Sequence, residues 1–287
     1  MSVRLDVMPP LSFPRSVLVE TTLRCPADCI FCPNKKISGR PIDMPWELFI
    51  KIVDDCRGKG VAGFHPFING EPLASPCLED ALAYISRTLP EAAIHIYTNG
   101  YLLDDSTTEM LLRYNVCEVH FSIDGFSKQV YEQHRRGLIY ERVIANVKGF
   151  LAHLENHTVK VGTRVVFTMT PDNEGEVPAF RQFWEGLVDT VDILPCDGRG
   201  GEGRLPAFKD AQKLGCFQAT ESTYILSDGS VVACCKDWAG YTVLGDVNIN
   251  SLQSIWNSTE YRSLRDDISR GILSSCEVCR RCVSDSL

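Results

Sequence analysis

The chain has 287 residues, 44% of them hydrophobic and 23% charged, a composition typical of a folded globular protein and unlike that of a disordered or coiled-coil chain. Its 37 acidic residues outnumber its 29 basic ones and give a net charge of −8, which argues against a broad nucleic-acid-binding surface. No apolar run approaches the roughly 18 residues that a membrane-spanning helix needs. The first residues also lack an apolar signal core, so we expect a cytoplasmic protein that binds neither membrane nor nucleic acid.

Short β-rich runs alternate with helical patterns over residues 16–194. Strands are expected at residues 16–21, 61–68, 92–97, 117–122, 158–169 and 190–194. Apolar residues recur at helical spacing between them, within residues 46–53, 143–151 and 180–187. This alternation predicts parallel strands with right-handed crossovers, hence an α/β fold built as a partial (β/α)6 barrel.

The pattern changes after Pro195. A glycine-rich stretch follows, and its composition predicts a linker or a substrate loop. Residues 224–233 form two β-rich runs around Asp228-Gly229, which predicts a hairpin, and two short helical segments follow near 251–257 and 259–271. We therefore divide the chain into a barrel at 1–195, a linker or substrate loop at 196–215 and a small C-terminal module at 216–287.

Cysteine is the unusual residue of this composition. There are 13 cysteines, an odd number that fits a disulfide framework poorly, and the chain shows no secretory signal. Nine of them fall into two groups, which indicates metal ligands. The groups are Cys25, Cys29 and Cys32, and then Cys216, Cys234, Cys235, Cys276, Cys279 and Cys282.

The first group, Cys25-x3-Cys29-x2-Cys32, directly follows the first predicted strand. Loops at the carboxyl ends of parallel strands are where α/β folds place their functional sites. Three thiolates can hold three irons of a 4Fe–4S cluster and leave the fourth iron open. A zinc loop is the alternative, but a structural zinc site takes four protein ligands and no fourth Cys or His follows at a suitable local spacing.

This cysteine spacing, with Phe31 just before the third cysteine, resembles that of the radical S-adenosylmethionine (SAM) superfamily. Three further motifs of that family follow in order, each at the end of a predicted strand: Asn69-Gly70-Glu71-Pro72, Thr98-Asn99-Gly100 and Ser122-Ile123-Asp124-Gly125. The family has a glycine where this chain has Asn69, so the resemblance leaves the glycine and glutamate as the contacts of the SAM amino group. The SAM-binding residues that the resemblance implies are Phe31, Gly70, Glu71, Thr98, Asn99, Ser122 and Asp124.

The resemblance also implies the chemistry. A reduced cluster cleaves bound SAM and leaves a 5′-deoxyadenosyl radical, which abstracts hydrogen from an unactivated carbon of the substrate. A flavodoxin- or ferredoxin-type protein is the expected electron donor. The alternative is an iron–sulfur electron carrier without turnover, but such a carrier needs neither an open iron nor the Gly70-Glu71 pair.

The second cysteine group resembles the Twitch and SPASM auxiliary-cluster domains of the same superfamily. That resemblance implies a second 4Fe–4S cluster held by four ligands, with Cys282 as an alternative ligand. Zinc is the other metal that two distant cysteines and a Cys-x2-Cys pair can hold. The implied ligands are Cys216, Cys234, Cys276 and Cys279.

From about position 16 to 282, with identity confined to motifs, the chain resembles radical SAM dehydrogenases that oxidise aminocyclitols such as 2-deoxy-scyllo-inosamine. Radical SAM epimerases of aminoglycosides and of peptides resemble it in using a cysteine hydrogen donor. The resemblance to the dehydrogenases implies that Arg199, in an Arg-Gly-Gly motif, contacts the reacting hydroxyl; an ion pair with Asp197 is the other interpretation. Loss of a second electron from the substrate radical would give a ketone, whereas a thiol donor would invert the carbon. Cys235, next to an implied ligand, is the candidate donor, with Cys196 in reserve. The expected substrate is a small polyol, aminocyclitol or sugar, with a peptide as the alternative.

Overall fold

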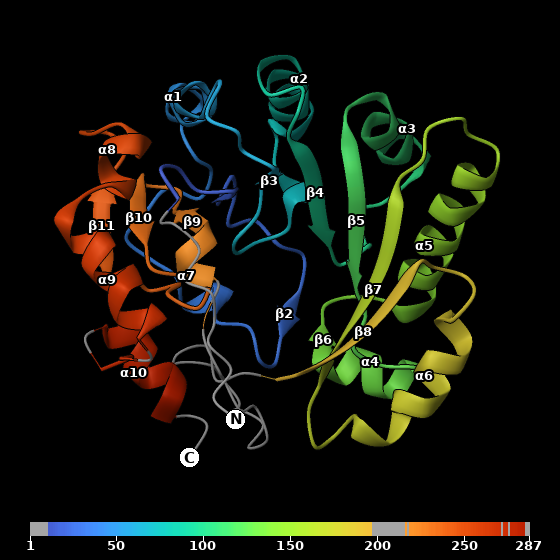
Figure 1. Ribbon diagram of the computed structural model, residues 1–287. Coiled ribbons are helices and arrows are strands. Elements are labelled where there is room, and N and C mark those ends of the chain that lie inside the picture. The colour runs from blue at the N-terminus through green and yellow to red at the C-terminus, as the bar shows by residue number, and fades with distance from the viewer. Residues whose placement is uncertain (1–10, 197–215, 217, 271, 275, 285–287) are drawn as a thin grey trace, which may run out of the picture.

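The computed structural model describes residues 11–196, 216, 218–270, 272–274 and 276–284. Within these residues the main feature is a nine-stranded sheet in the order β11-β10-β9-β1-β3-β4-β5-β7-β8 (Figure 1). The six strands predicted in the barrel are all present and run parallel to their neighbours. They are β1 (Ser16–Val19), β3 (Gly63–His65), β4 (Ala93–Thr98), β5 (Val116–Ser122), β7 (Gly162–Met169) and β8 (Thr190–Pro195).

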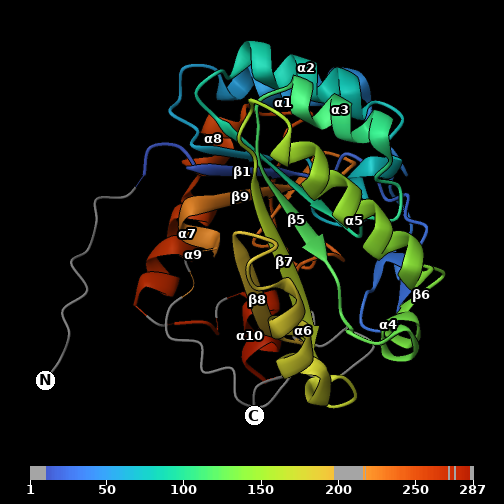
Figure 2. The same ribbon diagram turned by 90° about the vertical axis from the view of Figure 1, so that its right-hand side faces the viewer.

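Helices follow most of these strands, and α1, α2, α3 and α5 lie along the same outer side of the sheet (Figure 2). The barrel helices are α1 (Trp46–Cys56), α2 (Leu78–Thr88), α3 (Asp105–Arg113), α4 (Lys128–His134), α5 (Tyr140–Glu155) and α6 (Val177–Trp184). Short 3-10 helices lie at η1 (Asn34–Lys36), η2 (Pro72–Ala74) and η3 (Glu174–Glu176). In the described part of the chain, no helix combines the length and apolarity that a membrane span requires.

Side chains of each barrel strand alternate between two faces, as the geometry of a strand requires. The outer face is apolar and packs on the helices: the Phe121 ring lies 5.5 Å from Phe150 of α5, and the Phe167 ring 4.7 Å from Phe180 of α6, between centroids. The inner face, which we call the lumen, is polar and aromatic. Its residues include His65, His95, Tyr97, Glu118, His120, Arg164 and Asp192.

The C-terminal residues extend the barrel sheet. The strands are β9 (Ser222–Ile225), β10 (Ser230–Val232) and β11 (Val243–Asp246), and the helices are α7 (Gln218–Glu221), α8 (Leu252–Trp256), α9 (Thr259–Ser269) and α10 (Glu277–Ser284). Strand β9 pairs in parallel with β1, and β9 and β10 form the predicted antiparallel hairpin. Most buried apolar side chains of this region and of the barrel belong to one core, and Tyr224, Leu226 and Val232 form a smaller cluster with Ile68. The two helical segments predicted before the last cysteines are also present.

A second, two-stranded sheet lies outside the main one. It pairs β2 (Asp28–Cys29), within the first cysteine motif, with β6 (Arg135–Arg136), which follows α4. The register places Cys29 opposite Arg135. This pairing fixes the middle of the cysteine loop against the end of α4. The sequence did not predict either of these two short strands.

Candidate functional site

The first three cysteines line one cavity beyond the carboxyl end of β1. Gly70 and Asn34 line it too, and its lining has no further cysteine and no histidine. Burial raises the pKa of the Cys25 thiol to about 11 and that of Cys29 to about 12, so iron binding has to displace protons there. Three converging thiols without a fourth protein donor fit a 4Fe–4S cluster with one open iron.

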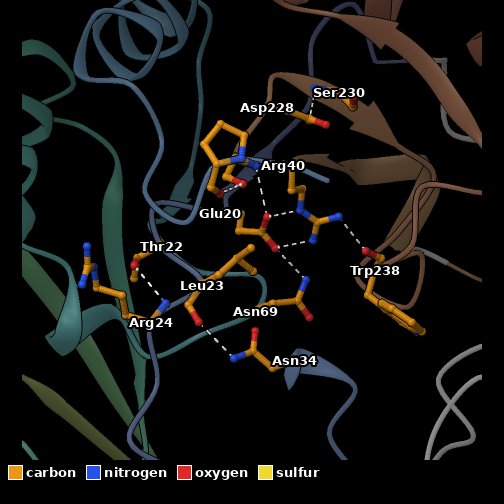
Figure 3. Close-up of polar contacts among 12 residues, drawn as sticks. Glu20, Thr22, Leu23, Arg24, Asn34, Arg40, Asn69, Asp228, Ser230 and Trp238 are labelled. Atoms are coloured by element: carbon orange, nitrogen blue, oxygen red, sulfur yellow. Dashed lines mark hydrogen bonds and ion pairs between the residues drawn. The ribbon is translucent and has the colours of Figure 1, made fainter. Parts of the chain in front are cut away.

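The backbone conformation and close packing at position 70 require a glycine. Its φ of +79° lies in the left-handed region, and a Cβ built there would come within 2.2 Å of the Thr22 carbonyl oxygen. The preceding Asn69, which stands where the family has glycine, directs its side chain to Glu20, with Nδ2 donating to Oε1 at 2.7 Å (Figure 3). Asn69 is not among the residues that line the cysteine cavity.

Glu71 joins the end of β3 to the end of β4. It is buried, and its carboxylate accepts hydrogen bonds from the backbone N–H of Asn99 at 2.7 Å and of Leu73 at 3.2 Å. Burial raises the pKa of this carboxyl to about 7. The Asn99 side-chain Nδ2 lies 3.8 Å from Cys25 Sγ, and Thr98 Oγ1 accepts from Gly100 N at 3.0 Å. Four of the predicted SAM-binding residues therefore lie at the cysteine cavity or next to it: Gly70, Glu71, Thr98 and Asn99.

At the end of β5, Ser122 is half-buried and Asp124 is fully buried. Asp124 Oδ2 lies 2.6 Å from Arg135 Nε, and Oδ1 accepts from Thr168 N at 2.6 Å. Both carboxylate oxygens are thus engaged by the protein. Asp124, like Ser122, stays a predicted SAM-binding residue.

Arg135 is a site residue that the sequence analysis missed. Its Nη1 lies 3.8 Å from Cys29 Sγ, and its guanidinium carbon lies 5.8 Å from the centre of the buried Phe31 ring. A buried cation beside the cysteines offsets part of the negative charge that thiolates and a reduced cluster bring. No local spacing links position 135 to the cysteine motif, so only the β2–β6 pairing could reveal it.

The four predicted auxiliary ligands lie near one another around Cys279. The Cys276 and Cys279 thiols hydrogen-bond to one another, and the charges of Cys234 and Cys216 contribute to raising the pKa of Cys279. Cys282 Sγ lies 3.6 Å from Lys236 Nζ. The donor set fits an auxiliary cluster held by the four predicted ligands.

The two candidate hydrogen donors differ in their surroundings. Cys196 is buried, and its backbone N–H donates to Met169 O at 2.7 Å. Cys235 is half-buried and packs against the buried cluster of Ile68, Tyr224, Leu226 and Val232. Burial first, then the charges of Glu118 and Cys235, raise the pKa of Tyr97 to about 12. The predicted Arg199 and Asp197 lie outside the described residues.

Comparisons with known proteins agree with this geometry. The family description "Radical SAM superfamily" matches residues 19–183, and "Iron-sulfur cluster-binding domain", the SPASM family, matches residues 216–283. A tungsten-containing aldehyde ferredoxin oxidoreductase cofactor-modifying protein of Pyrococcus furiosus is 24% identical over 91% of this chain and 86% of its own. The SAM-dependent 2-deoxy-scyllo-inosamine dehydrogenase of Niallia circulans is 20% identical over 92% of this chain and 90% of its own.

Solved structures share the fold. BtrN in complex with AdoMet and 2-DOIA superposes with a TM-score of 0.65 at 18% identity, covering 94% of this chain and 93% of that one. Streptococcus suis SuiB bound to the precursor peptide SuiA gives a TM-score of 0.72 at 16% identity, covering 95% of this chain and 72% of that one. These similarities support the partial barrel with a C-terminal cluster-binding module.

Proposed function

Because the chain belongs to the radical SAM superfamily, and its cofactors are SAM and two 4Fe–4S clusters, we propose that it epimerises a carbon of a small polyol, aminocyclitol or sugar. When bound and reduced, these cofactors supply a 5′-deoxyadenosyl radical that removes the hydrogen atom. Cys235 returns a hydrogen atom on the opposite face. The resulting thiyl group regains its thiol with one electron, from a flavodoxin- or ferredoxin-type donor, and one proton from solvent.

The position of Cys235 carries this proposal. A hydrogen donor has to reach the carbon from the face opposite to the abstraction, so its thiol has to border the substrate space. Cys235 is half-buried and within electrostatic range of Tyr97 on the lumen, whereas Cys196 is packed in the apolar core. Cys235 also directly follows the predicted ligand Cys234, so a cluster bound by Cys234 would hold the Cys235 backbone in place.

Residues at the strand ends would hold SAM. The Glu71 carboxylate would accept from the amino group, beside the close backbone approach that Gly70 permits. Asn99 would support the same end of the molecule because its backbone orients Glu71 and its side chain reaches Cys25. Arg135 would keep the cysteine loop in place through its contacts with Cys29 and Asp124.

Dehydrogenation is the second candidate. The similarity to the 2-deoxy-scyllo-inosamine dehydrogenase extends over nine-tenths of both chains and supports oxidation of a secondary alcohol to a ketone. Arg199 would then contact the reacting hydroxyl. The similarity to SuiB, crystallised with a precursor peptide, supports a peptide substrate less directly, because SuiB is covered over only 72% of its length.

A solvent-isotope experiment distinguishes these candidates. Anaerobically reconstituted enzyme, dithionite, SAM and a panel of aminocyclitols and amino sugars are incubated in D2O, and 5′-deoxyadenosine and product are measured by mass spectrometry. Epimerisation predicts one deuterium on the product carbon, because a thiol exchanges its proton with solvent. Dehydrogenation predicts a product two mass units lighter with no deuterium at carbon.

Substitution of the donor completes the test. Cys235→Ala should still form 5′-deoxyadenosine but should not release inverted product, while Cys117→Ala, at an exposed cysteine, should behave like the unmodified enzyme. Full epimerisation by Cys235→Ala would reject this donor. An oxidised, unlabelled product would establish the dehydrogenase instead. Absence of 5′-deoxyadenosine from fully loaded enzyme with every substrate would reject both reactions on this substrate class.

A further inference from the structure

Two histidines and a glutamate meet on the lumen, and none of them is a predicted ligand of either cluster. Glu118 Oε2 lies 2.7 Å from His120 Nε2 and 3.4 Å from His95 Nδ1, and the three atoms all lie within 4.8 Å of one another. The sheet register produces this arrangement. His95 of β4 pairs with Glu118 of β5, and His120, two residues further along β5, projects from the same face.

The surroundings of this triad hold its donor atoms in place. Arg164 binds the other carboxylate oxygen, Oε1, at 3.1 Å through Nη2 and 3.2 Å through Nε, which leaves Oε2 directed toward the histidines. Asp192 lies 2.6 Å from Arg164 Nη1 and offsets part of its positive charge. Hydrogen bonds of this kind, to the carboxylate oxygen that does not bind the metal, commonly orient a metal-binding glutamate.

Aromatic stacking fixes the two imidazole rings. His95 stacks on His65 at a centroid distance of 4.7 Å, and His120 stacks on Tyr97 at 4.1 Å. His120 Nε2 is buried and has no hydrogen bond of regular geometry, despite the short distance to Glu118.

We propose that His95, Glu118 and His120 bind one divalent transition-metal ion, for which zinc is the best match. Two imidazoles and one carboxylate are a common ligand set of catalytic zinc, with bonds of about 2.0–2.2 Å that place neighbouring tetrahedral ligand atoms roughly 3.3–3.6 Å apart. The contact of 3.4 Å between Glu118 and His95 matches that spacing, and the contact of 2.7 Å between Glu118 and His120 would lengthen on binding. The single negative charge of the set suits a divalent ion.

The site would keep an open position on the lumen side. The His95 and Glu118 side chains retain 23% and 19% exposure, so the triad is accessible from their side, whereas His120 is only 9% exposed. His120 lies two residues before Ser122, at the strand end where SAM is expected. The ion would bind a hydroxyl or carbonyl oxygen of the substrate and so position the neighbouring carbon. This role in catalysis rests on the proposed function, whereas the binding of the ion does not depend on it.

Metal analysis of the holoenzyme tests the site. Protein with both clusters fully reconstituted is equilibrated with Zn²⁺, passed through a desalting column, and assayed for zinc and iron by mass spectrometry. We expect about one zinc per chain at full iron content. We expect zinc retention to fall at least tenfold in Glu118→Gln and in His120→Ala, with iron unchanged. His153→Ala, at a histidine on the outer helix α5, is the matched control and should keep its zinc.

A second readout does not require retention on a column. Zinc should raise the melting temperature of the unmodified enzyme and of His153→Ala but not of Glu118→Gln, because only a protein that binds the ion is stabilised by it. No retained zinc and no thermal shift at full cluster loading would overturn the proposal. Equal zinc retention by the Glu118 and His120 variants would also overturn it. Since neither readout uses turnover, failure of the metal site and failure of the proposed epimerisation are separable.

Discussion

Removal of the Arg40 guanidinium tests how the barrel is joined to the C-terminal region. Arg40 Nε and Nη2 contact the two oxygens of Glu20 at 2.8 and 2.9 Å, and Nη1 donates to the Trp238 carbonyl at 2.8 Å (Figure 3). Glu20 also accepts from Asn69 Nδ2 at 2.7 Å and from Ser227 N at 3.1 Å. The side chains of Arg40 and Glu20 are only 6% and 0% exposed, so solvent cannot replace the lost partner.

Arg40→Met should therefore lower the free energy of unfolding by about 3–5 kcal/mol, the usual cost of leaving one charge of a buried pair alone. With a urea dependence of about 3 kcal/mol/M, the midpoint should shift by about 1–1.7 M. The double variant Glu20→Gln/Arg40→Met should lose less, because it leaves no unpaired buried charge. Arg113→Met, which breaks the exposed pair with Glu79, is the control and should change stability little. A loss below about 1 kcal/mol for Arg40→Met would refute this reasoning.

Three further predictions concern the cofactor sites. A variant with Cys25, Cys29 and Cys32 all changed to alanine should keep about four iron atoms per chain and lose all SAM cleavage; complete loss of iron would show that the C-terminal cysteines hold no cluster. Glu71→Gln should keep its iron but bind SAM about 10–100-fold more weakly, measured by isothermal titration, since a hydrogen bond to a charged group contributes about 1.5–3 kcal/mol; unchanged affinity would exclude this carboxylate as the amino-group acceptor. Iron removal by a chelator should make residues 216–284 more sensitive to protease before the barrel, because metal supports their fold; cleavage of the barrel first would contradict this.

Much of the barrel could be predicted because its signals are local. Each of the six strands is a short β-rich run, and helical stripes such as that of Trp46, Phe49 and Val53 match a helix that buries one face. The motifs predicted to bind SAM have local signals too, since Thr98 and Ser122 end strands β4 and β5 and the motif of Asn69 begins four residues after β3. The Asp228-Gly229 turn likewise marked the β9–β10 hairpin.

The missed features depend on contacts between distant segments. Pairing of β9 with β1 brings together residues about 206 positions apart, and no local pattern encodes it. Arg135 reaches Cys29 only through the β2–β6 pairing. The lumen triad left a trace in the sequence, because His95 and Tyr97, like Glu118 and His120, alternate with buried apolar residues, and polar residues on one face of a buried strand deserve a functional interpretation.

Strand β1 determines how the two cysteine groups lie relative to one another. Its carboxyl end leads to Glu20 and then to the loop of Cys25, while its neighbour β9 leads through the hairpin to Cys234 and Cys235. The register of β1 and β9, from Ser16 opposite Ser222 to Val19 opposite Ile225, fixes the Cys25 loop relative to the hairpin. The Glu20–Arg40 ion pair adds a second connection directly after β1. A shift of one residue in that pairing would move the hairpin by about 3.3 Å and turn its side chains to the opposite face. The thiol that we propose as hydrogen donor therefore depends on strand pairing as much as on its own identity.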